Sequence, residues 1–253
     1  MIGKKIIPCL DMKDGKVVKG INFVNIKEVG DPVDIAKDYC AQGADELVFL
    51  DIAATNEERK TRKDLVSLIS KNINIPFTVG GGIKSLEDIE EVLAVGANKI
   101  GINSAAIKNK VFLKEAIDKF GADKVVLALD GKRNEKGTWN VVVNGGEKDT
   151  GIDVVEWAKE ARAMGVNEIL LTSLDEDGEK KGYDLALTKA VKDATGAIVI
   201  ASGGCGTLED FYDVFKTDIA DSALAASIFH YKEIQIPELK TYLKNKGVNL
   251  YKE

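Results

Sequence analysis

The sequence predicts an α/β protein that closes into a (β/α)₈ barrel made of two similar half-barrels. Short apolar runs alternate with helical patterns eight times along the chain, as in proteins built from parallel βαβ units. A segment that begins at Thr78 recurs at Ile200, 122 residues later. The length of 253 residues is close to that of one barrel domain, so we expect a single domain over residues 1–253.

The predicted strands are short and almost wholly apolar. Residues 125–129, for example, read Val-Val-Leu-Ala-Leu, which is typical of a strand buried on both faces. The predicted strands are Lys5–Asp11, Glu46–Asp51, Pro76–Gly80, Lys99–Asn103, Lys124–Asp130, Glu168–Thr172, Ala197–Ser202 and Ser222–Ala226.

Helical periodicity fills the segments between these strands. The predicted helices are Pro32–Gln42, Glu58–Lys71, Leu86–Val95, Lys108–Phe120, Val154–Met164, Leu185–Ala194, Leu208–Phe215 and Ile236–Lys246. This alternation favours a closed barrel in a chain of this length, and an open, doubly wound sheet is the alternative.

The internal repeat strengthens the barrel prediction. Residues 78–89 match residues 200–211, and residues 46–50 match residues 168–172 at the same offset. A duplicated half-barrel predicts a duplicated ligand site. Two insertions, residues 12–30 and 131–150, interrupt the repeat, and the second resembles a hairpin that ends at Asn144-Gly145. Both follow strands, so we expect them on the C-terminal face as possible lids.

Composition excludes several classes of protein. A net charge of −6 argues against a nucleic-acid binder but is compatible with a phosphorylated small molecule, because backbone N–H groups bind phosphate. Three cysteines without metal or CxxC spacing indicate a reducing cytosol. We find no signal peptide and no apolar stretch of membrane-spanning length, and therefore expect a cytoplasmic protein.

Two glycine runs, Gly80–Gly82 and Gly203–Gly204, follow the third and seventh strands. Asn103-Ser104 and Ser227 lie at the ends of the strands that come next. Each pair could form a cup lined by N–H groups, which predicts a substrate with a phosphate at each end. The alternative is that the glycines only allow tight turns.

Two aspartates, Asp11 and Asp130, close apolar strands in related positions of the two halves. At the barrel mouth this pair could act as general base and general acid, or each could simply cap the element that follows. Asp51 and Asp177 could bind substrate hydroxyls or stabilise turns. The only histidine is His230 and no ligand spacing is present, so we expect neither a metal nor a cofactor.

Charged residues also begin four strands, at the opposite end of the barrel. Lys5, Glu46, Lys99 and Glu168 alternate in sign and could form a ring of ion pairs that gates a channel, or could be ordinary solvated strand ends. Lys19, in the first insertion, could clamp a phosphate, but a surface lysine is the more common case.

The chain resembles one enzyme family along its whole length. It is similar to the cyclase subunit of imidazole glycerol phosphate synthase, of histidine biosynthesis. The similarity is carried by Cys9–Gly20, Gly43–Ile52, Phe77–Ile83, Ile102–Ala106, Gly182–Asp184 and Ile200–Gly204. The resemblance implies a lyase that takes ammonia and a ribulosyl-formimino aminoimidazole carboxamide ribonucleotide with two phosphates. The products would be imidazole glycerol phosphate and aminoimidazole carboxamide ribonucleotide.

The resemblance also assigns roles to residues. Asp11 would be the catalytic base, Asp130 the acid and Lys19 a mobile-loop lysine. Substrate and phosphate would be bound by Asp51, Gly82, Asn103, Ser104, Thr172, Asp177, Gly178, Gly204 and Ser227. Lys5, Glu46, Lys99 and Glu168 would gate the entry of ammonia from a glutaminase partner docked on the N-terminal face.

The sequence departs from the family pattern at four places. One is Lys216–Ser222, which replaces a Gly-Ala-Asp-Ala-like run and has one extra residue. Glu179 replaces the usual threonine beside the second cup, Gly101 replaces a serine, and Asn98 replaces an acid near the face that would meet the partner. The alternatives are the sister isomerase of the same pathway, a paralogue that delivers ammonia to a nucleotide-linked sugar, and a non-catalytic barrel with one weakened cup.

Overall fold

The fold comes from a computed structural model that describes residues 3–13, 16–21, 24–51 and 56–251. For residues 13, 19–21, 24–28 and 56–62 only the backbone is described.

Eight parallel strands form a closed barrel. They are β1 (Lys5–Lys13), β4 (Leu47–Asp51), β5 (Phe77–Gly80), β6 (Lys99–Ile102), β7 (Val125–Arg133), β10 (Glu168–Ser173), β11 (Ile198–Ser202) and β12 (Ser222–Ala225). Each strand pairs with the next, and the pairings of β7 with β10 and of β12 with β1 complete the circle. The predicted (β/α)₈ barrel is confirmed.

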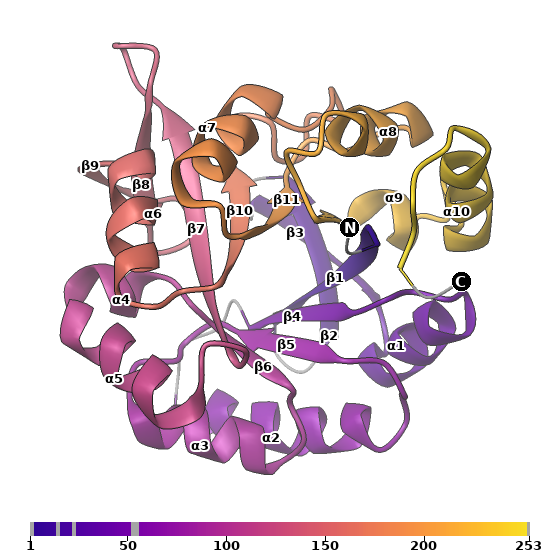
Figure 1. The fold of residues 1–253 in the computed structure, drawn as a ribbon. Helices are drawn as coiled ribbons and strands as arrows, with labels where there is room; N and C mark the ends of the chain where they lie inside the picture. The colour runs from indigo at the N-terminus through magenta and orange to yellow at the C-terminus, as the bar shows by residue number, and fades with distance from the viewer. Residues whose placement is uncertain (1–2, 14–15, 22–23, 52–55, 252–253) are drawn as a thin grey trace.

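Helices surround the strands as an outer layer (Figure 1). They are α1 (Pro32–Ala41), α2 (Asn56–Ser70), α3 (Leu86–Ala94), α5 (Lys110–Phe120), α6 (Val154–Ala163), α7 (Leu185–Thr195), α8 (Leu208–Lys216) and α10 (Ile236–Asn245). Two short helices that periodicity did not predict separately, α4 (Ser104–Lys108) and α9 (Ser227–His230), directly follow β6 and β12. The side chain of Asn109 accepts a hydrogen bond from the backbone N–H of Phe112, and so separates α4 from α5.

The two insertions do not interrupt the repeat, contrary to the interpretation of the sequence. Each folds as an antiparallel hairpin that continues the strand before it: β2 (Lys16–Ile21) and β3 (Val24–Gly30) extend from β1, and β8 (Trp139–Val143) and β9 (Lys148–Asp153) extend from β7. The hairpin is therefore part of each half-barrel, and the sequence hid this because the two hairpins share little residue identity.

The halves also share their helix caps. Asp31 and Asp153, 122 residues apart, each accept hydrogen bonds from two backbone N–H groups at the start of α1 and α6. Ser85 and Thr207, again 122 apart, each form a reciprocal capping box with the aspartate three residues later. The repeat is thus preserved in the polar contacts that begin the helices, as well as in the apolar pattern.

Two layers of apolar side chains hold the barrel. The larger one lies between the strands and the helices and includes the fully buried Trp157, Phe49 and Phe211. The smaller one fills the barrel interior with side chains from six strands: Ile7, Cys9, Val48, Val126, Leu170, Ile200 and Leu224. Because this interior plug lies below the strand ends, it forms the floor on which a site at the mouth rests.

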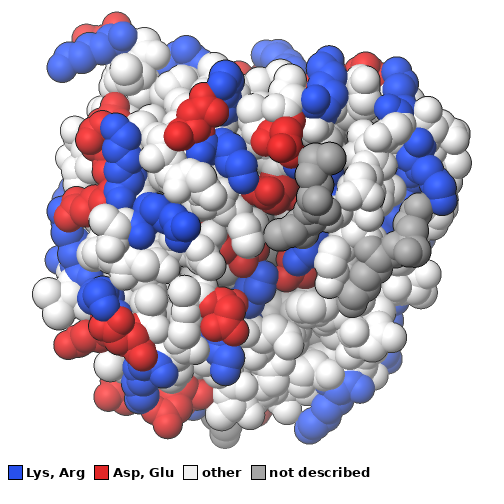
Figure 2. Space-filling view, viewed as in Figure 1, with Lys and Arg blue, Asp and Glu red and all other residues white. Residues whose placement is uncertain are grey.

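Acidic and basic side chains are interspersed over the face shown in Figure 2. Several form exposed ion pairs within a helix: Lys114 pairs with Asp118 in α5, and Lys189 pairs with Asp193 in α7. A search of the described helices finds none long and apolar enough to cross a membrane.

The duplicated capping boxes give the first prediction. Ser85→Ala and Thr207→Ala should each lower the free energy of unfolding by about 1 kcal/mol, because each removes the acceptor of one helix N–H group, that of Asp88 or Asp210. Urea denaturation measures the change. Thr241→Ala, which removes an exposed hydroxyl inside α10, is the control and should cost less than about 0.5 kcal/mol. A cost confined to one of the two caps would contradict their equivalence.

Candidate active site

The strands open at their C-terminal ends into a cavity of about 840 Å³. The sequence predicted residues for the base, for the acid and for the binding of substrate and phosphate. Those among them whose side chains are described all lie at the cavity wall: Asp11, Asp51, Gly82, Asn103, Ser104, Asp130, Thr172, Asp177, Gly178, Gly204 and Ser227. The side chain of Lys19 lies outside the described part of the chain, so its role remains a prediction. One cavity therefore collects residues from both halves.

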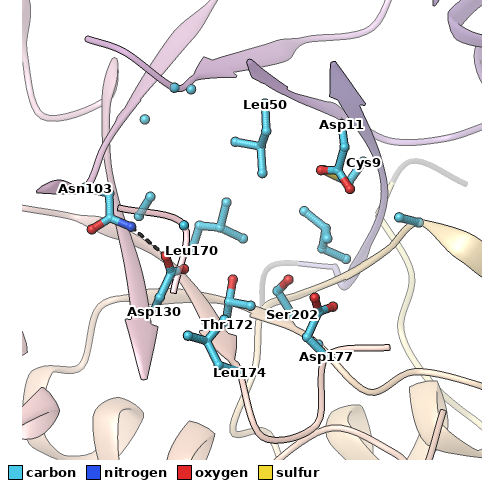
Figure 3. A pocket seen from close by; sticks show the side chains of 18 of the residues that line it. Cys9, Asp11, Leu50, Asn103, Asp130, Leu170, Thr172, Leu174, Asp177 and Ser202 are labelled. Atoms are coloured by element: carbon cyan, nitrogen blue, oxygen red, sulfur yellow. Dashed lines mark hydrogen bonds between the residues drawn. The ribbon is translucent and has the colours of Figure 1, made fainter. Parts of the chain in front are cut away.

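Strand register places Asp11 and Asp130 at equivalent rungs. Asp11 in β1 pairs with Leu50 in β4, and Asp130 in β7 pairs with Thr172, the residue 122 positions after Leu50. The two carboxylates lie on opposite sides of the cavity with Leu50 and Leu170 between them (Figure 3). A molecule in the cavity would thus meet one carboxylate on each side.

The environment of Asp130 favours its protonated form. The pKa of this carboxyl is raised from 3.8 to about 6, and burial is the main cause. The negative charge of Asp177 also raises the pKa. Two hydrogen bonds lower it in part, one of 2.7 Å from Asn103 Nδ2 and one with Thr172. A carboxyl with a pKa near 6 holds a proton in part of the molecules at neutral pH, and can therefore donate one.

Asp11 lies in a different environment. Its side chain is buried, and the thiol of Cys9 lies 3.6 Å from Asp11 Oδ1. Cys9 belongs to the apolar plug, so Asp11 stands where the plug meets the cavity. The two aspartates are equivalent in register and different in partners, as an acid and a base need to be.

The first glycine cup is formed by the loop after β5 and the start of α4. Gly81 and Gly82 have φ of +92° and +64°, and a Cβ on Gly81 would come within 1.9 Å of Asp51 O. Only glycine allows this backbone to pass so close to the end of β4. Ser104 Oγ accepts a hydrogen bond of 3.1 Å from Asn144 N, which ties the β8–β9 turn to this cup.

The second cup repeats the first. Gly203 and Gly204 have φ of +89° and +95°, and a Cβ on Gly203 would lie 2.5 Å from Ser173 O. Ser173 occupies the position equivalent to Asp51, 122 residues later. The same backbone conformation therefore recurs where the sequence predicted a second phosphate cup.

Glu179 does not enter the cavity. It is exposed, pairs with Lys181 at 2.8 Å, and is absent from the described cavity wall, which includes its neighbours Gly178 and Lys180. The Lys181 partner holds the pKa of the Glu179 carboxyl below its ordinary value. The departure from the family pattern at this position therefore places no carboxylate in the second cup.

The opposite end of the barrel carries the predicted alternation of charges. Glu46 accepts from Lys5 at 3.1 Å and from Lys99 at 2.8 Å, and Lys99 also contacts Glu168 at 2.7 Å. Both glutamates are buried. Burial lowers the pKa of Lys99, but the carboxylates of Glu168 and Glu46 outweigh burial and raise it above 10.5, so Lys99 is a cation at neutral pH.

Asn98 keeps a structural contact despite replacing an acid. Its Oδ1 accepts from Phe77 N at 3.0 Å, as Asp221 accepts from Val199 N at 2.8 Å in the other half. Gly101 lies at the cavity wall, and a Cβ there would meet Gly80 Cα at 3.6 Å, an ordinary van der Waals contact.

Sequence reasoning missed several residues at the cavity wall. The polar ones are Lys84, Lys108, Asn144, Glu147 and Lys180. Lys84 comes two residues after Gly82, and Lys180 comes two residues after Gly178, so closeness to residues assigned to the cups could have indicated both. Lys108 and Glu147 reach the wall through α4 and the β8–β9 turn, which local sequence does not place.

The fold and the site define a (β/α)₈ barrel whose cavity is flanked by two equivalent glycine cups, and comparison with known proteins shows its family. The sequence model of the family described as "Histidine biosynthesis protein" matches residues 5–235. Similar proteins named imidazole glycerol phosphate synthase subunit HisF come from Clostridium beijerinckii, 58% identical over 98% of both chains, and from Clostridium botulinum strain Alaska E43, 59% identical over 97% of both. The relative of that name from Clostridium botulinum strain Okra is 54% identical over 99% of both chains.

The chain belongs to this HisF family, the cyclase subunits of a lyase in histidine biosynthesis. The isomerase and non-catalytic alternatives are thereby set aside.

The environment of Asp130 gives the second prediction. Its carboxyl should titrate near pH 6 when followed by ¹³C NMR, and Asp177→Asn should lower that pKa because it removes a negative charge. Because the pKa of Asp130 is higher in the folded state, its protonated form stabilises the fold below pH 3.8. This contribution to the unfolding free energy is lost as the pH rises from 3.8 through about 6. Relative to Asp130→Asn, the wild type should lose roughly 2–3 kcal/mol of unfolding free energy across that range. A carboxyl that titrates near pH 4 in both proteins would contradict this environment.

Proposed function

We propose that the cavity binds a ribulosyl-formimino aminoimidazole carboxamide ribonucleotide by its two phosphates and cyclises it with ammonia. The observation that carries the proposal is the combination of two equivalent glycine cups and two aspartates around one cavity. One phosphate would bind at Gly82, Asn103 and Ser104, and the other at Gly178, Gly204 and Ser227. Backbone N–H groups suit this task in a chain of net charge −6, because they bind phosphate without a large positive field.

The two carboxyls would divide the proton transfers. Asp11 would act as the base that removes a proton as ammonia adds and the imidazole ring closes. Asp130 would act as the acid that protonates the leaving group, and its pKa of about 6 supports that role. The products would be imidazole glycerol phosphate and aminoimidazole carboxamide ribonucleotide.

The remaining polar residues would orient the substrate. Asn103 donates to Asp130, so it could fix the acid while its neighbour Ser104 contacts a phosphate. Asp51, Thr172 and Asp177 would bind groups of the linking chain, and Lys19 would close over the reacting centre with the β2–β3 hairpin. Exclusion of water would protect the intermediates from hydrolysis.

Ammonia would enter from the opposite end of the barrel. The relatives are named as subunits of a synthase, which supports a partner subunit, and a glutaminase docked on the N-terminal face would release ammonia there. Neutral ammonia would pass the charged group of Lys5, Glu46, Lys99 and Glu168, then the apolar plug. We also infer a single catalytic domain over residues 1–253 and a cytoplasmic location.

The third prediction tests the two aspartates. With the two-phosphate substrate and ammonium chloride, Asp11→Asn and Asp130→Asn should each lose at least roughly a hundred-fold in kcat, since each removes one proton-transfer group. Circular dichroism should show an unchanged fold. Asp149→Asn, an exposed carboxylate on β9, is the control and should keep wild-type turnover. Wild-type rates in both cavity variants would remove the carboxyls from the mechanism.

The fourth prediction tests the gate. Lys99→Met removes the cation that links Glu46 and Glu168, and should change turnover driven by glutamine with the partner subunit much more than turnover driven by added ammonium. It should also lower the unfolding free energy by about 3 kcal/mol, because the buried Glu168 loses its contact with Lys99 and the buried Glu46 keeps only Lys5. Lys110→Met, which breaks an exposed ion pair with Glu160, is the matched control. Equal effects on both modes of turnover would argue against a gate.

A further inference from the structure

Lys180 is held against the second cup by the backbone around it. It lines the cavity together with Gly178 and Gly204, and its φ of +56° is uncommon for a residue with a side chain. A Cβ on Gly206 would lie 2.7 Å from Lys180 Cβ, and Gly182 N donates to Gly204 O at 2.8 Å. The β10–α7 loop that carries Lys180 is therefore packed directly on the glycine loop of the cup.

The ammonium of Lys180 contacts a residue from the other side of this cup. Lys180 Nζ lies 2.6 and 2.7 Å from the two carboxylate oxygens of Glu233. Glu233 N in turn donates to Ile228 O at 2.9 Å, next to Ser227. The ion pair thus connects the loops that follow β10 and β12, and Ser227 and Gly204 belong to the cup between them.

This ion pair contributes little stability by itself, so its cation can be exchanged. The side chains of Lys180 and Glu233 are 38% and 41% exposed, and ion pairs of that exposure are weak because water screens them. A dianionic phosphate is a stronger partner for an ammonium group than a solvated carboxylate is. An occupied second cup would therefore attract Lys180 away from Glu233.

The two halves supply their cations from different places. The lysines described at the cavity wall are Lys84 and Lys108, next to the first cup, and Lys180. The position equivalent to Lys84 in the second half is Gly206, and the contact with Lys180 Cβ leaves no room there for a side chain. The second half therefore has glycine where the first half has Lys84. Lys180, from the neighbouring β10–α7 loop, lies against that glycine.

We propose that Lys180 binds the phosphate in the second cup, and that Glu233 is the counter-ion it leaves when substrate enters. Lys180 would then counter the negative charge of Asp177 at the same end of the cavity. The inference rests on the proposed function, because it assigns a further residue to one of the two phosphate sites.

The experiment compares four proteins in steady-state turnover of the two-phosphate substrate at saturating ammonium chloride. They are the wild type, Lys180→Met, Glu233→Gln and the control Lys181→Met, whose lysine pairs with the exposed Glu179. Lys180→Met should raise KM roughly ten-fold with kcat nearly unchanged, because it removes one charge-assisted contact to a phosphate. Glu233→Gln should lower KM or leave it equal, and Lys181→Met should match the wild type.

The variants separate binding from a purely structural role. If the ion pair only braced the loops, Lys180→Met and Glu233→Gln would raise KM by the same factor, and the inference would be overturned. It would also be overturned if Lys180→Met had the KM of the wild type. Thermal unfolding should give the same midpoint for both variants, within about 2 °C. Absence of turnover in the wild type would contradict the proposed function, and inorganic phosphate binding by wild type and Lys180→Met would then still test the contact.

Discussion

The closure of the parallel sheet is the constraint on which the rest of the structure depends. When β7 pairs with β10 and β12 with β1, the carboxyl ends of all eight strands face one rim, and residues far apart in sequence become neighbours. A charged side chain at the end of an apolar strand then points into the cavity at that rim, because burial among apolar side chains would be costly. Asp11 and Asp130 are brought to opposite sides of one cavity for this reason, and no contact between them is needed.

The two halves of the site share their backbone conformation and differ in the side chains around the two aspartates. The backbone of the two cups is nearly the same, with φ near +90° at Gly81 and Gly203. The side chains around the equivalent aspartates differ: Asp130 accepts from Asn103 and lies near Asp177, while Asp11 lies beside Cys9. The duplicated backbone therefore presents two carboxyls to one cavity in different surroundings.

Much of this organisation could be predicted from the sequence. The eight strands and their helices follow from the alternation of apolar runs and helical periodicity, and the residues at strand ends follow from topology. The equivalence of the two hairpins could not be predicted, because hairpins are specified by backbone pairing that many sequences satisfy. Lys108 and Glu147 were missed because their position at the cavity depends on how α4 and the β8–β9 turn pack on the barrel. The orientation of the Glu179 side chain also depends on loop packing and could not be predicted. In the structure it faces solvent and pairs with Lys181.

The proposed reaction requires one elongated molecule to span both cups. The most direct test is a crystal structure with a non-reactive analogue of the two-phosphate substrate bound. We predict one phosphate against Gly82 and Ser104, the other against Gly204 and Ser227, and the reacting carbon and nitrogen atoms between Asp11 and Asp130. An analogue that binds with both phosphates in the same cup, or with its reacting atoms away from both aspartates, would contradict the account.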